Sequence, residues 1–194
     1  MALMIQRGKE WIRINTQKNY IEYSTNDGRS WHTRYTGTHA GDFIDLIDYG
    51  PEIIACTSKG IFASTNGGGN WHSRYSGNLA GSFIQLVVDG RDILATTTKG
   101  LYYSNNGGLS WHNRFTSSLA GYFNDLFDNG TEILACTSKG VFSSKDEGHS
   151  WHSRCTNSAF GEFRQLASDG QNLLATTSKG LFCSKDGGHS WHRR

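Results

Sequence analysis

The sequence predicts an all-β protein built from five four-stranded antiparallel sheets, and three observations support this prediction. The dipeptide Trp-His recurs at positions 31, 71, 111, 151 and 191, a constant spacing of 40 residues. Each unit holds four short runs of β-branched and aromatic residues, separated by turns rich in Gly, Asn, Asp and Ser. The 194 residues include 24 glycines, a density that disfavours long helices. Because four strands in about 40 residues is the size of a propeller blade, we expect a five-bladed β-propeller.

The second unit illustrates the expected elements. Its apolar runs predict strands over residues 43–47, 53–57, 61–64 and 71–75, which form a meander. In the first unit, which diverges most from the others, residues 3–5 supply the first strand. We expect a single domain with these approximate blades: 1–40, 41–80, 81–120, 121–160 and 161–194. A solenoid is the main competitor, but leucine-rich repeats are shorter, and helical repeats need a periodicity that is absent here.

The turn between the third and fourth strands follows the pattern Ser-x-Asn/Asp-x-Gly-x-x-Trp in all five units. The short carbonyl side chain can accept backbone N–H groups of its own turn, and the glycine permits a positive φ. The tryptophan can cover the hairpin with a large apolar surface. We therefore expect a structural role for these residues: Ser24, Asn26, Gly28, Trp31, Ser64, Asn66, Gly68, Trp71, Ser104, Asn106, Gly108, Trp111, Ser144, Asp146, Gly148, Trp151, Ser184, Asp186, Gly188 and Trp191.

This pattern resembles the Asp-box, or bacterial neuraminidase repeat, of sialidases and other Asp-box propellers, and the resemblance covers essentially the whole chain. Three copies depart from the family preference for aspartate, because they carry Asn26, Asn66 and Asn106. The resemblance implies a β-propeller in which the box is a folding device on the face away from the active site. It implies little about function, because unrelated functions share this fold.

Lysine recurs at the turn between the second and third strands. If the first strand is innermost, these turns and the connections between blades lie on one face of the propeller, and the boxes lie on the other. The lysines would then form a basic collar that attracts an anionic or polyhydroxylated ligand, or they are simply solvated turn residues. They are Lys18, Lys59, Lys99, Lys139 and Lys179.

Each fourth strand carries a histidine and an arginine two residues apart, which places both on one face of the strand. One interpretation is structural, with the arginine packed on a neighbouring blade and its head paired locally. The other is a binding site for sugar hydroxyls or a carboxylate. The residues are His32, Arg34, His72, Arg74, His112, Arg114, His152, Arg154, His192 and Arg194.

Composition excludes several classes of protein. The formal net charge of +2 does not indicate nucleic acid or membrane binding, and no apolar run reaches the ~18–20 residues of a membrane helix. Residues 1–5 are too short for the apolar region of a secretory signal, so a reducing, cytoplasmic compartment is the default expectation. The cysteines, Cys56, Cys136, Cys155 and Cys183, form no CxxC pair, so we expect neither disulfides nor zinc. We expect no cofactor and no metal, since the five histidines would lie well apart.

We therefore expect a non-catalytic binding module, with a lectin-like protein that binds glycans at equivalent blade sites as the first hypothesis. Weak sites of this kind gain avidity when they are linked. The alternative is a scaffold that binds a protein, as in the photosystem II stability factors that this repeat also resembles. A recently amplified or laboratory-made repeat without an evolved ligand is a third hypothesis.

A sialidase-like glycoside hydrolase fits less well, because such an enzyme needs non-equivalent residues that converge on one pocket. Here the inward-facing acids Asp45 and Asp125 alternate with Gln85 and Gln165 around a symmetric repeat. We expect a monomeric ring, with a dimer that shares blades as the alternative.

Overall fold

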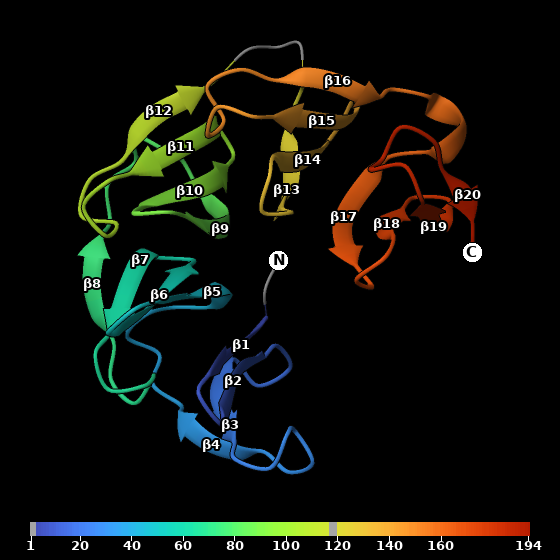
Figure 1. Ribbon diagram of the computed structural model, residues 1–194. Helices are drawn as coiled ribbons and strands as arrows, with labels where there is room; N and C mark the ends of the chain where they lie inside the picture. The colour runs from blue at the N-terminus through green and yellow to red at the C-terminus, as the bar shows by residue number, and fades with distance from the viewer. Residues whose placement is uncertain (1–2, 117–119) are drawn as a thin grey trace. The chain divides into compact units, whose positions relative to one another are not determined.

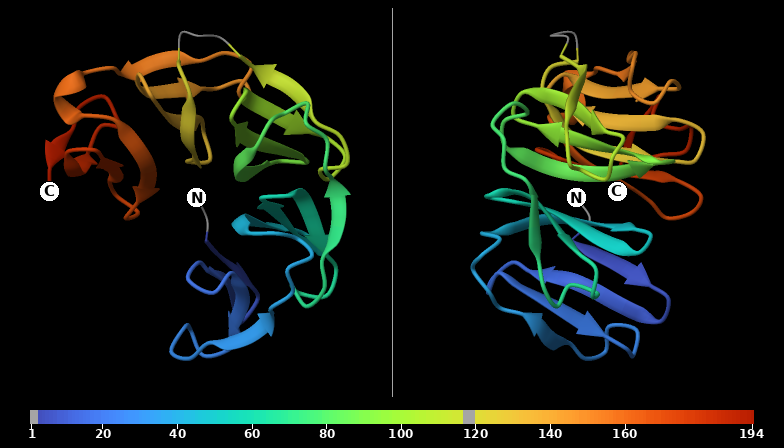
Figure 2. Two further views of the ribbon diagram at one scale, coloured as in Figure 1. Left: turned by 180° about the vertical axis from the view of Figure 1, so that it is seen from behind. Right: turned by 90° about the vertical axis from the view of Figure 1, so that its left-hand side faces the viewer.

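Four consecutive strands form each sheet of the computed structural model, which describes residues 3–116 and 120–194 (Figure 1). Neighbouring strands are antiparallel and are paired in chain order, so each sheet is the predicted meander. The fold is a five-bladed β-propeller, which confirms the expected fold class. Figure 2 shows the twist of the same sheets in two further views.

The strand bounds agree closely with the repeat pattern. Blade 1 contains β1 (Met4–Arg7), β2 (Glu10–Asn15), β3 (Tyr20–Ser24) and β4 (His32–Tyr35). Blade 2 contains β5 (Phe43–Tyr49), β6 (Glu52–Thr57), β7 (Gly60–Ser64) and β8 (His72–Tyr75). Blade 3 contains β9 (Phe83–Asp89), β10 (Asp92–Thr97), β11 (Gly100–Ser104) and β12 (His112–Phe115).

The last two blades repeat this plan. Blade 4 contains β13 (Phe123–Asp128), β14 (Ile133–Thr137), β15 (Gly140–Ser144) and β16 (His152–Cys155). Blade 5 contains β17 (Phe163–Ser168), β18 (Leu173–Thr177), β19 (Gly180–Ser184) and β20 (His192–Arg193). A short 3-10 helix, η1 (Ser158–Phe160), lies in the connection between them.

The chain divides into two compact units. Unit 1 comprises Met1–Thr98 and Tyr103–His112, and unit 2 comprises Lys99–Tyr102 and Asn113–Arg194. Within unit 1, β5 contacts both β1 and β9, and within unit 2, β13 contacts β17. The first strands of neighbouring blades therefore lie side by side inside each unit.

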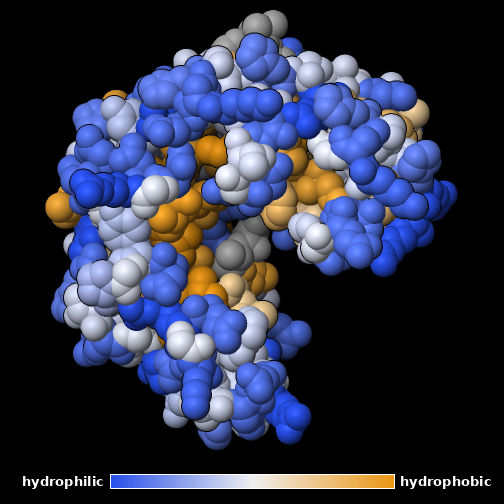
Figure 3. Space-filling view, viewed as in Figure 1, coloured by the Kyte–Doolittle hydropathy of each residue, from blue (hydrophilic) through white to orange (hydrophobic). Residues whose placement is uncertain are grey.

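Aromatic rings link one blade to the next inside each unit. Phe43 on β5 lies between Trp71 of its own blade and Tyr35 of the preceding blade, with ring centroids 5.0 Å and 5.9 Å away. Phe83, Phe123 and Phe163 pack in the same way on the tryptophans of their own blades. Apolar residues also show between the blades in Figure 3, while most of the visible surface is hydrophilic.

The contacts of two blades depart from this arrangement. Cys155 takes the place of Tyr35 before blade 5, and Phe160 of η1 fills the space, 6.3 Å from the ring of Phe163. In blade 1, the guanidinium of Arg13 lies 4.0 Å from the centre of the Trp31 ring and also pairs with the buried carboxylate of Glu22. A cation–π contact and an ion pair thus stand where the other blades have apolar side chains.

None of the described residues belongs to a helix with the length and hydropathy that crossing a bilayer requires. All four cysteines are free thiols.

Candidate functional site

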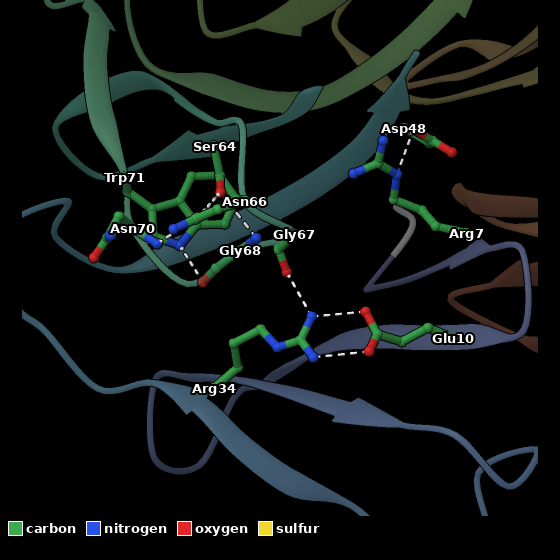
Figure 4. A network of polar contacts seen from close by, with 10 residues as sticks. All are labelled: Arg7, Glu10, Arg34, Asp48, Ser64, Asn66, Gly67, Gly68, Asn70 and Trp71. Carbon is green, nitrogen blue, oxygen red and sulfur yellow. Dashed lines mark hydrogen bonds and ion pairs between the residues drawn. The ribbon is translucent and has the colours of Figure 1, made fainter. Parts of the chain in front are cut away.

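The hairpin between the third and fourth strands is held by its own side chains. In blade 2, Ser64 Oγ donates to Asn66 Oδ1 (3.0 Å), and the backbone N–H of Gly68 donates to Ser64 Oγ (2.8 Å). Asn66 Oδ1 also accepts the backbone N–H of Asn70 (2.8 Å), and Trp71 Nε1 donates to the carbonyl of Gly68 (3.1 Å; Figure 4). These side chains hold the turn and the indole in place, as the pattern predicts.

Aspartate performs the same task in the last two blades. Asp146 Oδ1 accepts the backbone N–H of Ser150 (2.9 Å), and Asp146 Oδ2 accepts the Ser150 hydroxyl (2.6 Å). Hydrogen bonds from the Ser150 hydroxyl and backbone lower the pKa of Asp146 to about 2. The pKa of Asp186 is also lowered, first by the Ser190 hydroxyl. The hairpin therefore accepts either an amide or a carboxylate at this position.

Three of the candidate arginines bridge neighbouring blades. Arg34 makes a forked pair with Glu10 (2.6 and 2.7 Å) and donates to the carbonyl of Gly67 in the hairpin of blade 2 (3.0 Å; Figure 4). Arg74 holds Glu52 and the carbonyl of Gly107 in the same way. Arg154 pairs with Glu132 and donates to the carbonyl of Gly187. We call Arg34, Arg74 and Arg154 the junction arginines, because each joins its own blade to the next hairpin.

The other two candidate arginines, Arg114 and Arg194, make different contacts because different residues surround them. In unit 2, Arg114 contacts Nε2 of His149 in the following hairpin. Arg194 lies on blade 5, where Asn172 stands in the place of Glu52. Its side chain is 54% exposed, and its guanidinium lies 3.7 Å from the carboxylate of Asp169.

Two of the candidate lysines brace the connections between blades. Lys59 Nζ donates to the carbonyls of Thr38 and His39 (3.2 and 3.1 Å). Lys179 Nζ donates to the carbonyls of Ser158 and Ala159 (3.3 and 3.2 Å). The other three also lie at exposed turns: Lys18, Lys99 and Lys139.

The five candidate histidines lie on the fourth strands and are exposed. The ring centroids of His32 and Tyr23 are 5.5 Å apart, and His112 and Tyr103 repeat this spacing. Among residues 3–116 and 120–194, no group of three or more side chains could hold a metal ion.

The inward-facing acids connect neighbouring first strands. Asp45 is fully buried, and its Oδ2 accepts the backbone N–H of Leu86 (2.9 Å). Asp125 accepts the backbone N–H of Leu166 (2.8 Å) in unit 2. Burial, and secondarily the carboxylate of Asp45, raises the pKa of the Cys56 thiol well above its usual value. These carboxylates therefore hold backbone in the core of the sheets.

Unit 2 carries a cleft that the sequence did not indicate. It has a volume of about 500 Å³ and lies between the β14–β15 turn and the connection to blade 5. Lys139, Phe142, Asn157 and Glu162 are among its lining residues. Tyr122, which is 74% exposed, is anchored beside it, because its backbone N–H donates to Ser138 Oγ of the cleft wall (3.0 Å).

A signal for this surface exists in the repeat. The residue between the invariant glycine and the phenylalanine of the first strand changes from blade to blade: Asp42, Ser82, Tyr122 and Glu162. Sequence reasoning weighed the repeated charges and overlooked this varied position.

No family model matches the chain, and no curated protein matches it. Solved structures do share its fold. An ancestral GH74 enzyme matches with a TM-score of 0.69 and 18% identity over 98% of this chain and 30% of its own. YCF48 from Cyanidioschyzon merolae matches with a TM-score of 0.65 and 20% identity over 97% of this chain and 67% of its own.

A chain of a nidogen/laminin complex matches with a TM-score of 0.72 and 14% identity over 96% of this chain and 76% of its own. This chain thus spans less than a third of the GH74 enzyme and about two thirds of YCF48. Propellers with this fold include enzymes and proteins solved in complexes with other proteins, so the fold alone does not assign an activity.

Proposed function

We propose that the chain is a non-catalytic propeller scaffold that binds a protein partner, with the cleft of unit 2 and Tyr122 as the contact surface. The observation that carries this proposal is a fixed backbone position with a variable side chain. The backbone N–H groups of Asp42, Ser82, Tyr122 and Glu162 each donate to a serine or threonine hydroxyl at 2.8–3.0 Å. All four side chains are exposed. A fixed backbone that carries a different side chain in each blade suits recognition of an asymmetric partner.

Tyr122 is the strongest anchor on this surface. Tyrosine supplies a large apolar contact area and a polar tip, and it is enriched among the residues that dominate binding between proteins. The lining of the cleft adds the apolar ring of Phe142 and the polar side chains of Asn157 and Glu162. A peptide segment could therefore place one apolar side chain in the cleft and pair its polar groups with the rim.

The repeated arginines and lysines support the lectin hypothesis less well in the structure than they do in the sequence analysis. The guanidinium groups of Arg34, Arg74 and Arg154 are engaged by a carboxylate and a carbonyl of the chain itself. The ammonium groups of Lys59 and Lys179 are engaged by backbone carbonyls. A glycan would have to compete with these contacts. We also assign the hairpins to the Asp-box type, on the pattern and on the hydrogen bonds described above.

Two structural neighbours agree with a protein ligand. YCF48 has been solved bound to D1 peptide, and nidogen has been solved with laminin. These complexes were solved for the neighbours, and a protein ligand for this chain is our proposal.

The test is selection of peptides from a displayed library on the intact chain, followed by calorimetry with the tightest peptide. We expect Tyr122→Ala to weaken binding about tenfold or more, as loss of a central aromatic anchor does. Leu109→Ala is the matched control, because Leu109 is 60% exposed on a hairpin tip of unit 1, and this variant should bind normally. Unchanged affinity of Tyr122→Ala would contradict the proposed site. Binding of multivalent glycans on an array, with loss in His72→Ala, would favour the lectin instead.

A further inference from the structure

The turn between β13 and β14 in unit 2 contains the tripeptide Asn129-Gly130-Thr131. Asparagine followed two residues later by serine or threonine, with any residue except proline between them, is the acceptor pattern for an N-linked sugar. The chain contains this pattern once. A pattern this short also arises by chance, so its meaning depends on the geometry of the turn.

The side-chain carbonyl of Asn129 holds the turn. Its Oδ1 accepts the backbone N–H groups of Thr131 (3.0 Å) and Glu132 (2.9 Å). It also accepts the hydroxyl of Thr131 (2.9 Å). These donors fix the amide with its oxygen toward the turn. Within residues 3–116 and 120–194, Nδ2 of Asn129 has no hydrogen-bond partner.

Blade 5 shows that the turn does not require an amide. Asp169 takes the place of Asn129, and its Oδ1 accepts the backbone N–H groups of Gln171 (3.1 Å) and Asn172 (2.8 Å). The backbone agrees as well, because in both turns the N–H of this residue donates to the carbonyl three residues later at 3.2 Å. An oxygen acceptor is therefore sufficient to build the turn, and the fold has no need of the amide nitrogen.

The turn is open to solvent within unit 2. Asn129, Gly130 and Thr131 are all exposed. A Cβ atom built on Gly130 would meet nothing within 4 Å, so there is space around the centre of the turn. The turn follows the last residue of β13, whereas Tyr122 precedes the first. A sugar on Asn129 and a partner on Tyr122 would therefore lie at opposite ends of this strand.

We propose that Asn129 is the acceptor for an N-linked sugar. The donor is a sugar whose anomeric carbon carries a diphosphate leaving group, attached either to a nucleoside or to a polyisoprenoid lipid. Nδ2 of Asn129 attacks the anomeric carbon, so a carbon–nitrogen bond forms while the bond from this carbon to the diphosphate oxygen breaks. The diphosphate leaves with the electron pair of that bond, and the amide nitrogen gives one proton to a base of the transferase.

Thr131 is the recognition residue of this site. Its hydroxyl lies 2.9 Å from Oδ1 of Asn129, so a transferase that binds the hydroxyl also positions the amide nitrogen. Serine supplies the same hydroxyl, and alanine does not. The inference does not depend on the proposed partner of Tyr122.

Intact-mass spectrometry of the full chain tests the inference in two arms. In the first, the purified, folded chain is incubated with a soluble N-glycosyltransferase and a nucleotide sugar. In the second, a cleavable leader directs the chain into the secretory pathway of eukaryotic cells, where it meets the lipid-linked donor. We expect one sugar unit or one oligosaccharide per chain, and attachment in one arm alone identifies the donor. Peptide mapping places the attachment, because an amidase that cleaves the sugar–asparagine bond leaves aspartate at position 129.

Four variants make the test specific. Asn129→Asp keeps the oxygen that holds the turn, as Asp169 does in blade 5, so it should keep the thermal midpoint and gain no sugar. Thr131→Ala should lose the attachment, and Thr131→Ser should retain it. Asn113→Gln is the matched control, because Asn113 is an exposed asparagine outside the pattern, and this variant should be modified like the wild type.

Three results would overturn the inference. They are a wild-type chain that gains no sugar in either arm, attachment that persists in Asn129→Asp, or equal attachment to Thr131→Ala and the wild type. Far-ultraviolet circular dichroism of each variant verifies that it is folded.

Discussion

The carboxylate of Asp45 accepts the backbone N–H of Leu86 at 2.9 Å, which joins the first strands of blades 2 and 3. The two residues are 41 positions apart in the sequence, which is one 40-residue repeat plus one residue. Asp125 and Leu166 form the same contact in unit 2. Because a buried backbone N–H needs an acceptor, these carboxylates serve the packing of neighbouring blades.

Removing this acceptor should destabilise the fold. Asp45→Ala leaves the N–H of Leu86 without this acceptor in a buried position, and we expect the free energy of unfolding to fall by about 2 kcal/mol. Gln165→Ala, at the equivalent but exposed position of blade 5, is the control and should change stability by less than about 0.5 kcal/mol. Urea unfolding measures both, and equal effects of the two substitutions would contradict the assigned role.

The contribution of the junction arginines to stability should depend on the planar, two-donor geometry of the guanidinium group as well as on its charge. The side chains of Arg74 and Glu52 are only 18% and 20% exposed. We expect Arg74→Ala to cost about 2 kcal/mol of unfolding free energy, and Arg74→Lys to restore less than half of it, because an ammonium cannot form the forked pair.

A double-mutant cycle with Glu52→Gln would measure the coupling between the two side chains. Arg29→Ala, on an exposed hairpin tip, is the control. Additive effects of the Arg74 and Glu52 substitutions would show that the pair does not contribute as a unit.

The aspartate hairpins should make the fold sensitive to acid. The pKa of Asp146 is lowered to about 2 from 3.8, first by the Ser150 hydroxyl, so the folded state favours the ionised form. This contribution to stability is fully present above the unfolded pKa and is lost as the pH falls through the folded pKa, between about pH 4 and pH 2. Asp146→Asn should therefore reduce the loss of stability in that interval, and the hairpins with Asn26 and Asn66 show that an amide fits.

Chemical denaturation at a series of pH values checks this expectation. Ser150→Ala is the companion variant, because it removes a donor to the carboxylate and should move the loss of stability to higher pH. Identical pH profiles for the wild type and Asp146→Asn would refute the link between the hairpin and acid stability.

The strands and hairpins could be predicted because their determinants are local. Alternating apolar residues and glycine turns define each strand, and the side chains of Ser64 and Asn66 act within their own turn. The role of Arg34 could not be read in the same way, since its partners lie 24 residues before it and 33 residues after it. The recurrence of glutamate at positions 10, 52 and 132 was the available signal.

The proposed binding surface was harder to predict for a different reason. Repeated residues are the candidates for binding that the sequence suggests, but in this structure repeated residues such as Arg74 and Lys59 pack one part of the chain against another. Arg74 has the same contacts as Arg34 and Arg154, and Lys59 has the same kind of contacts as Lys179, all with groups of the chain itself. Tyr122 differs from its equivalents, and such a difference has meaning only after the structure shows that the backbone beneath it is fixed.

The contact of a junction arginine with the glycine hairpin of the next blade has a consequence for how the chain can grow. A segment such as blade 2 brings both an arginine for the next hairpin and a hairpin for the preceding arginine, so its duplication creates a neighbour that already fits. Gain or loss of a whole repeat then needs no compensating substitutions, whereas an insertion of a few residues within a segment would move the arginine and the hairpin out of register.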